Sequence, residues 1–177
     1  MTSANIRPAG EADLVAINDI YNHYVLHSTC TWQEEPEPIE GRRQWFSHHG
    51  TNHPVIVAKV NGQVVGWGSL SPFRERSAYR NTVENSVYVH HEHHRRGIGS
   101  ALSQDLITRA RVLGFRAMIA VIDADQDASV VLHEKFGFQK VGRLKQVGFK
   151  FGRWLDVIYM ELLLPPANRP NNTPQTP

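Results

Sequence analysis

The residues best suited to chemistry lie in one stretch, VYVHHEHHRRGIGSALSQDL, which runs from Val87 to Leu106. It holds four histidines, a glutamate, two arginines and two glycines before an amphipathic pattern begins. Imidazoles can bind a metal ion, whereas a glycine-containing turn at the start of a helix can bind a phosphate group. These two interpretations predict different kinds of protein.

The metal interpretation is the weaker one. The helical zinc signature places a second histidine four residues after the first, with a glutamate next to the first. Here His91-Glu92 starts such a pattern, but the second position is Arg95. Arg95 and Arg96 would also repel a divalent cation. We therefore expect no metal, and we interpret the histidines as a solvated loop that responds mildly to pH.

The phosphate interpretation rests on the segment RRGIGS, at 95–100. Glycines let the backbone approach a ligand closely. The first N–H groups of a helix have no intrahelical partner and favour an anion, and the arginines add positive charge. The spacing matches neither a Walker loop nor a dinucleotide fingerprint. On its own, the segment is as compatible with an ordinary glycine-containing turn as with a phosphate site.

The surrounding elements must position this turn. Hydrophobic periodicity predicts helices over 11–25, 39–49, 97–113 and 127–136. Strands are predicted at 5–8, in a hairpin over 54–70 around Asn61-Gly62, and at 82–89, 115–122, 138–147 and 154–164. This mixed order indicates one α/β (mixed α+β) sheet with at least one parallel crossover.

Composition limits the class of protein. The chain has 177 residues, a formal charge of +2 and one cysteine, so it can form no intrachain disulfide and carries no excess charge for binding nucleic acid. No segment is apolar enough to span a membrane or to serve as a secretory signal, so we expect a cytoplasmic protein. We predict a single domain over 1–164 and a proline-rich, disordered tail over 165–177.

Within its surroundings, the segment HRRGIG resembles the pyrophosphate-binding motif Q/R-x-x-G-x-G/A of the GCN5-related N-acetyltransferases (GNAT), with His94 in place of glutamine or arginine. The blocks IYNHYVLHSTCTW, YRNTVENSVYVH and ASVVLHEKFGFQKVGRLKQVGFKFGRWLDV are similar to the phosphinothricin and methionine sulfone or sulfoximine branch. The resemblance covers about residues 5–164.

This resemblance implies the GNAT acyl-CoA N-acyltransferase fold, a mostly antiparallel mixed sheet flanked by helices, with a splayed parallel strand pair. It implies acetyl-CoA as co-substrate, direct attack by a small amino-acid-like amine in a ternary complex, and a homodimer. The cofactor-binding positions that it implies are Val87, Tyr88, Val89, Arg95, Arg96, Gly97, Ile98, Gly99, Ser100, Gln126 and Ser129.

Two residues are candidates for catalysis. From the residues alone, Glu84 in TVENSVYV is a glutamate that faces water on an edge strand, but the resemblance implies that it is the general base. His133, in LHE, stands where many GNAT members carry a tyrosine acid. It is either a structural histidine or the group that protonates the leaving thiolate or assists deprotonation of the amine.

An amino-acid substrate carries a carboxylate, and Arg74 and Arg80 lie just before the strand that holds Glu84. We predict that Arg74, Arg80 and Glu84 bind the substrate, with the arginines on its carboxylate. Each is equally compatible with a solvated basic loop. Cys30 is interpreted as structural.

Two rival functions stay open: acetylation of another amine, such as a polyamine, an aminoglycoside or a protein N-terminus, and a non-catalytic coenzyme A sensor.

Overall fold

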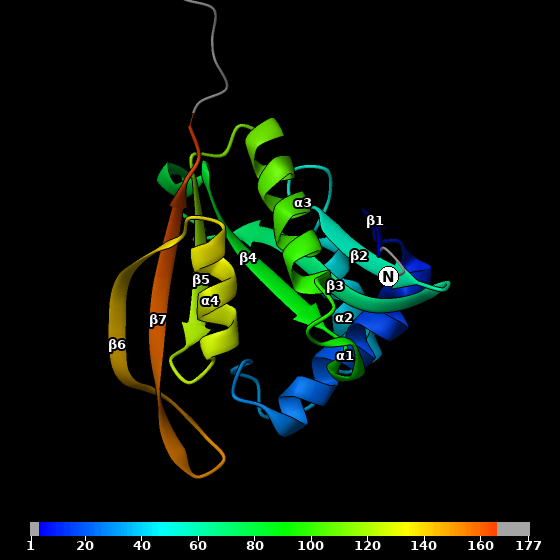
Figure 1. Cartoon of the computed structure of the whole chain (residues 1–177), viewed down its shortest axis with the longest axis horizontal. Helices are drawn as coiled ribbons and strands as arrows, with labels where there is room; N and C mark the ends of the chain where they lie inside the picture. Colours follow the sequence, from blue (N-terminus) through cyan, green and yellow to red (C-terminus); the bar gives the residue numbers. More distant parts are fainter. Residues whose placement is uncertain (1–3, 166–177) are drawn as a thin grey trace, which may run out of the picture.

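The computed structural model describes residues 4–165, in which one seven-stranded sheet has the order β1-β2-β3-β4-β5-β7-β6 (Figure 1). Its strands are β1 Asn5–Pro8, β2 Val55–Val60, β3 Gln63–Pro72, β4 Thr82–Val89, β5 Ala117–Asp123, β6 Gln139–Lys150 and β7 Arg153–Leu163. The helices are α1 Leu14–His27, α2 Ile39–Ser47, α3 Ile98–Val112 and α4 Asp127–Lys135, with short 3-10 turns at 11–13, 77–79 and 91–93.

Every predicted helix and strand is present, and the differences lie at element ends. The strand predicted at 138–147 extends to Lys150 because it forms a hairpin with the last strand that closes at Phe151-Gly152. Both turn residues have positive φ, 52° and 74°, which matches the twist of paired strands. Apart from Pro165, the predicted disordered tail lies outside the described residues.

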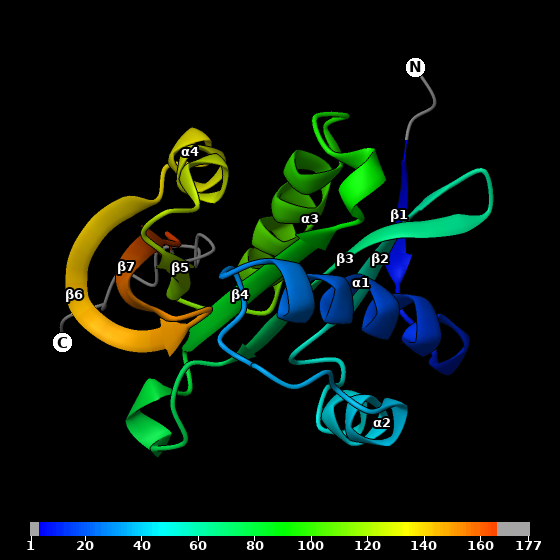
Figure 2. The same cartoon turned by 90° about the horizontal axis from the view of Figure 1, so that it is seen from below.

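The helices cover the sheet on both sides, with α1 and α2 on one face and α3 and α4 on the other (Figure 2). The larger core cluster, which includes Leu102, Leu106 and Met118, lies between the sheet and α3. Gly66 of β3 allows close packing there, because a Cβ at this position would lie 3.2 Å from the Leu102 side chain. A smaller cluster around Ile17 and Trp67 lies on the α1 and α2 face.

The sheet opens at its centre. β4 and β5 are the parallel pair, and their ladder extends only from Thr82–Ala117 to Glu84–Ile119. Beyond Glu84 the two strands diverge, while β4 stays paired with β3 on its other edge (Figure 1). The resemblance predicted this splayed pair, and the fold is confirmed. The opening creates space for a ligand between two central strands.

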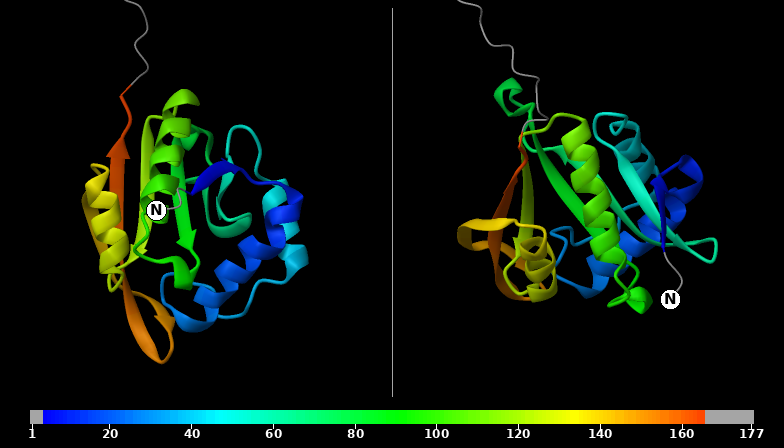
Figure 3. Two further views of the ribbon diagram at one scale, coloured as in Figure 1. Left: turned by 45° about the vertical axis from the view of Figure 1, so that its right-hand side comes forward. Right: turned by 45° about the horizontal axis from the view of Figure 1, so that its top comes forward.

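The end of the β6–β7 hairpin extends beyond the body of the sheet, near the segment that follows α1 (Figure 3). Lys150 of β6 connects the two, because its Nζ donates hydrogen bonds to the carbonyl oxygens of Ser28 at 2.8 Å and Thr31 at 2.9 Å. The Lys150 side chain is buried. It therefore fixes the 28–31 segment against the hairpin.

Among the described residues, no helix is long and apolar enough to cross a membrane.

Candidate active site

A cavity of about 560 Å³ occupies the opening between β4 and β5 and extends to the start of α3. Glu84 and His133 line it, and so do all the predicted cofactor residues except Arg96. The remaining lining comes from α1, the segment after it, β4, the loop between β4 and α3, β5 and α4. It consists of Tyr24, Cys30, Trp32, Asn85, Ser86, His93, His94, Ala120, Val121, Ile122, Asp123, Ala128 and Leu132.

The α3 end of this cavity has the geometry of an anion site. Gly97 has a φ of 79°, which reverses the chain from β4 into the helix. The first helical hydrogen bond runs from the Ala101 N–H to the Gly97 oxygen at 3.0 Å. The N–H groups of Ile98, Gly99 and Ser100 therefore precede the hydrogen-bonded part of the helix. Together with the positive end of the helix dipole, they fit a pyrophosphate.

His94, the unusual first residue of the motif, contacts α1. Its Nε2 lies 2.6 Å from the hydroxyl oxygen of Tyr24, and that hydroxyl donates its one proton to the carbonyl oxygen of Val89. Burial raises the pKa of Tyr24 to about 12, so its hydroxyl stays protonated and can donate at neutral pH. The motif is therefore joined to α1 by side chains at the point where β4 ends.

The other histidines of this stretch do not form a metal site. His91 stacks on His23 of α1, with ring centroids 3.9 Å apart and planes 10° apart. Within residues 4–165, no group of three or more histidine, cysteine, aspartate or glutamate side chains could hold a metal ion. The histidine cluster instead packs the loop against α1.

Glu84 lies on β4, the fourth strand of the sheet, and pairs with Ser71 of β3 and Ile119 of β5. The interpretation of an edge strand, suggested by the residues alone, is therefore wrong. Burial raises the pKa of Glu84, and the positive charge of Arg74 opposes this rise. A carboxylate with a raised pKa is a stronger base than an exposed one, as general-base catalysis near neutral pH requires.

His133 is buried and both of its ring nitrogens have partners. Nδ1 lies 2.7 Å from the carbonyl oxygen of Ser129, so it must carry the proton. Nε2 lies 3.0 Å from Nδ2 of Asn85 and accepts its hydrogen bond. Burial lowers the pKa of His133, which favours this neutral form. In this arrangement Nε2 has no proton to donate to a leaving group.

The two predicted substrate arginines lie outside the cavity. Arg74 is exposed, stacks on Phe73 and donates to its carbonyl oxygen at 2.9 Å, although its charge still acts on Glu84. Arg80 is also exposed and donates to the Ser77 oxygen at 3.2 Å. The structure therefore brings together the predicted catalytic residues and the predicted cofactor residues other than Arg96, but neither Arg74 nor Arg80 lies with them.

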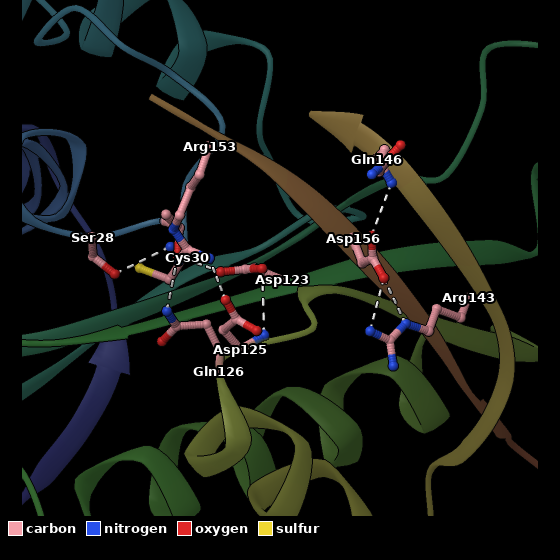
Figure 4. Close-up of polar contacts among 10 residues, drawn as sticks. Ser28, Cys30, Asp123, Asp125, Gln126, Arg143, Gln146, Arg153 and Asp156 are labelled. Atoms are coloured by element: carbon pink, nitrogen blue, oxygen red, sulfur yellow. Dashed lines mark hydrogen bonds and ion pairs between the residues drawn. The ribbon is translucent and has the colours of Figure 1, made fainter. Parts of the chain in front are cut away.

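Figure 4 shows a polar cluster in which Asp123, Cys30 and the predicted Gln126 all belong to the lining of this cavity. Asp123 of β5 is buried and accepts a hydrogen bond from the hydroxyl of Thr29. The side-chain amide of Gln126 donates to the same hydroxyl at 3.3 Å. Cys30 lies beside them, and burial raises the pKa of its thiol, so a nucleophilic thiolate is disfavoured. The resemblance indicated Gln126 as a cofactor position, whereas it assigned no role to Asp123.

The geometry agrees with comparisons to known proteins. A family model described as the Acetyltransferase (GNAT) family matches residues 17–138. The L-methionine sulfoximine/L-methionine sulfone acetyltransferase of Pseudomonas aeruginosa is 43% identical over 167 residues, which cover 93% of this chain and 97% of that protein.

Solved structures extend the comparison. A phosphinothricin acetyltransferase from Sinorhizobium meliloti, in complex with AcCoA, has a TM-score of 0.89 and 41% identity, covering 92% of this chain and 89% of that chain. A ribosomal-protein-alanine N-acetyltransferase from Brucella melitensis has a TM-score of 0.88 and 43% identity, and the match covers 90% of this chain and 99% of that chain. The chain therefore belongs to the GNAT family of N-acetyltransferases, as its motifs predicted.

Proposed function

We propose that this enzyme transfers the acetyl group of acetyl-CoA to the amino group of a small amino-acid-like substrate of the methionine sulfone, methionine sulfoximine or phosphinothricin type. One observation carries the proposal: Glu84, whose pKa burial raises, lines a cavity that continues between β4 and β5 to the phosphate-binding start of α3. The names of the relatives supply the substrate class.

Acetyl-CoA supplies the acetyl group as a reactive thioester, and the chain contributes binding and proton transfer. The amides at the start of α3 would bind the pyrophosphate. Beyond Glu84, the edge of β4 that faces β5 has no ladder partner, so its N–H groups are free to bind pantetheine amides and to polarise the thioester carbonyl. Glu84, directly or through water, would take the proton that the amine nitrogen loses on attack.

His133 is the second residue that we assign to the reaction. Its ring lies in the cavity wall, fixed between Ser129 and Asn85. With Nε2 as an acceptor, it is better suited to receive a proton or to orient a group than to protonate the thiolate. For the substrate carboxylate, Arg74 is the stronger of the two predicted arginines because its charge acts on Glu84, whereas the Arg80 side chain turns back to its own loop.

The first experiment is thiol release from acetyl-CoA with a panel of amines. It contains phosphinothricin, methionine sulfoximine, methionine sulfone, ordinary amino acids, spermidine, an aminoglycoside and a peptide that begins with alanine. We expect fast turnover with the first three. Turnover confined to the peptide would favour the ribosomal-protein alternative, which the name of the Brucella melitensis relative suggests. Tight acetyl-CoA binding without any turnover would favour a sensor.

We further propose a cytoplasmic homodimer built from one domain over 1–164. A row of large apolar side chains on the β6–β7 hairpin supports the dimer, because each is about half exposed: Val141, Leu144, Val147, Phe149, Phe151 and Trp154. Apolar patches of this kind mark protein interfaces. Light scattering of the wild-type protein and of Trp154→Glu tests this, with a dimer and a monomer expected. A monomeric wild-type protein would refute it.

A further inference from the structure

A second cavity, of about 490 Å³, lies on the α1 and α2 face of the sheet. It shares Ser86 and Tyr88 with the candidate active site, so the two cavities meet along this part of β4. Ser71, which also lines the second cavity, pairs with Glu84 in the β3–β4 ladder. The cavity therefore begins beside the proposed base, yet the proposed reaction gives it no role.

Arg42 of α2 is the charged group in this cavity, and its side chain is only 4% exposed. The guanidinium carbon lies 4.5 Å from the ring centroid of Tyr21 and 4.7 Å from that of Trp45. Its Nε donates to Oδ1 of Asn18 at 3.1 Å. Aromatic rings thus pack around the guanidinium, and one of its five N–H groups is hydrogen-bonded.

The guanidinium of Arg42 makes few direct polar contacts with the described residues. In the described part of the chain, no carboxylate forms an ion pair with Arg42, and its other guanidinium N–H groups make no hydrogen bond. Cation–π contacts offset part of the cost of burying a cation, but they do not supply hydrogen-bond acceptors. The arginine therefore lacks the oxygen atoms that a buried guanidinium normally binds.

A second donor in the same cavity also lacks an acceptor. Trp67 is 2% exposed, and its indole Nε1 is buried without a hydrogen-bond partner among the described residues. The Trp67 ring centroid lies 5.6 Å from the guanidinium carbon of Arg42. Buried donors almost always have acceptors, so Trp67 is an exception that lies beside the guanidinium. The remaining N–H groups of Arg42, which have no acceptor among the described residues, are the donors that a ligand with oxygen atoms would bind.

The charge of the cavity limits which anion fits. Glu37 also lines it, and its carboxylate accepts a hydrogen bond from Gln33 at 3.1 Å. Burial lowers the pKa of Arg42, and the negative charge of Glu37 opposes this shift. One positive and one negative side chain leave the cavity nearly neutral. A ligand with a single negative charge is therefore favoured over a polyphosphate.

We propose that Arg42 binds the carboxylate of an amino-acid-like ligand in this second cavity. The ligand class rests on the proposed function, whereas the cavity and its unpaired donors do not. The carboxylate belongs either to the amine substrate, extended from Glu84 across the shared part of β4, or to a separate small carboxylate bound beside it. The planar guanidinium and the planar carboxylate are suited to a bidentate contact.

The probe is deaminated methionine sulfone, which keeps the carboxylate and the sulfone but has no amine to acetylate. Calorimetry measures its binding to wild type, Arg42→Gln and Arg43→Gln. Arg43 is the matched control because it lies next in α2 but is exposed and pairs with Glu40. We expect Arg42→Gln to weaken binding by about 10- to 100-fold, the usual effect of losing charge-assisted hydrogen bonds, and Arg43→Gln to have no effect.

Kinetics then distinguish the two sources. If the substrate supplies the carboxylate, the probe competes with methionine sulfone, and Arg42→Gln raises KM for methionine sulfone but not for its primary amide. If a separate carboxylate binds, the probe binds through Arg42 without competing. Equal binding by wild type and folded Arg42→Gln, or no binding to wild type, would overturn the proposal. If Arg42→Gln does not fold, a wild-type crystal structure with the probe decides, because its carboxylate must lie against Arg42.

The binding experiment does not depend on acetyl transfer. A protein that acetylates none of the amines but binds the probe through Arg42 would refute the proposed function and keep this site. A protein that acetylates methionine sulfone but binds the probe equally well without Arg42 would do the reverse.

Discussion

The replacement Glu84→Gln tests the assignment of the general base. Glutamine keeps the size and polarity of the side chain but cannot take a proton from the amine. A positioned general base contributes about 100- to 10,000-fold to the rate, and we expect kcat/KM for methionine sulfone to fall within this range. The matched control is Glu161→Gln, which replaces a partly buried strand glutamate that lines neither cavity.

The pH dependence gives the assignment a second signature. Because burial raises the pKa of Glu84, activity should rise with pH through a value above the usual range of a glutamate, and this limb should be absent in Glu84→Gln. The assay is thiol release from acetyl-CoA over a pH series. A variant that keeps more than about a tenth of the wild-type kcat/KM, or that keeps the same acidic limb, would refute the reasoning.

Stability separates loss of catalysis from loss of folding. When folding raises the pKa of a carboxyl, the protonated group contributes to the stability of the fold. This contribution is complete below the unfolded pKa and is lost as the pH rises through the folded pKa. At neutral pH the ionised Glu84 therefore opposes folding. Glu84→Gln should melt at the wild-type temperature or above it, as thermal unfolding at neutral pH measures. A clear drop in Tm would assign the lost activity to misfolding.

Three further predictions concern the turn before α3, the buried Lys150 and the protonation of His133. Gly97→Ala forces a non-glycine residue to a φ of 79°, so it should lower the free energy of unfolding by about 1–2 kcal/mol and raise KM for acetyl-CoA. The control Gly10→Ala, at a φ of −126°, should change neither quantity. Lys150→Met removes the hydrogen bonds to two loop carbonyls and should lower stability by about 1–3 kcal/mol in urea unfolding; unchanged stability would contradict it. His133 should show a neutral, Nδ1-protonated ring in nitrogen NMR at neutral pH, and an imidazolium signal would contradict this.

Local rules explain why so much of the site could be predicted. Asn61-Gly62 specifies a hairpin turn because both residues tolerate positive φ, and here they adopt 50° and 83°. RRGIGS predicts a tight turn into a helix for a similar reason, and Gly97 has the expected left-handed backbone. These features involve neighbours in the chain, so their cause is visible in the sequence.

Contacts between distant residues could not be predicted in this way. His133 receives its hydrogen bond from Asn85, 48 positions away, and Lys150 binds carbonyls more than a hundred positions away. Periodicity indicates which residues are buried but not which ones meet. The positions of Arg74 and Arg80 outside the cavity likewise depend on the path of an exposed loop, which hydrophobic burial does not constrain.

The sequence by itself determined the helices and strands, the glycine-containing turn into α3 and the family, because backbone preferences, hydrophobic period and short motifs act locally. Only the tertiary structure decided the chemical state of the side chains. Burial raises the pKa of Glu84 because the strand order makes β4 central, and burial lowers the pKa of His133 because α4 packs it beside Asn85. Arg42 lies buried among aromatic rings because α1, α2 and β3 meet around it. Desolvation and pairing depend on which elements come together, and that is a property of the whole fold.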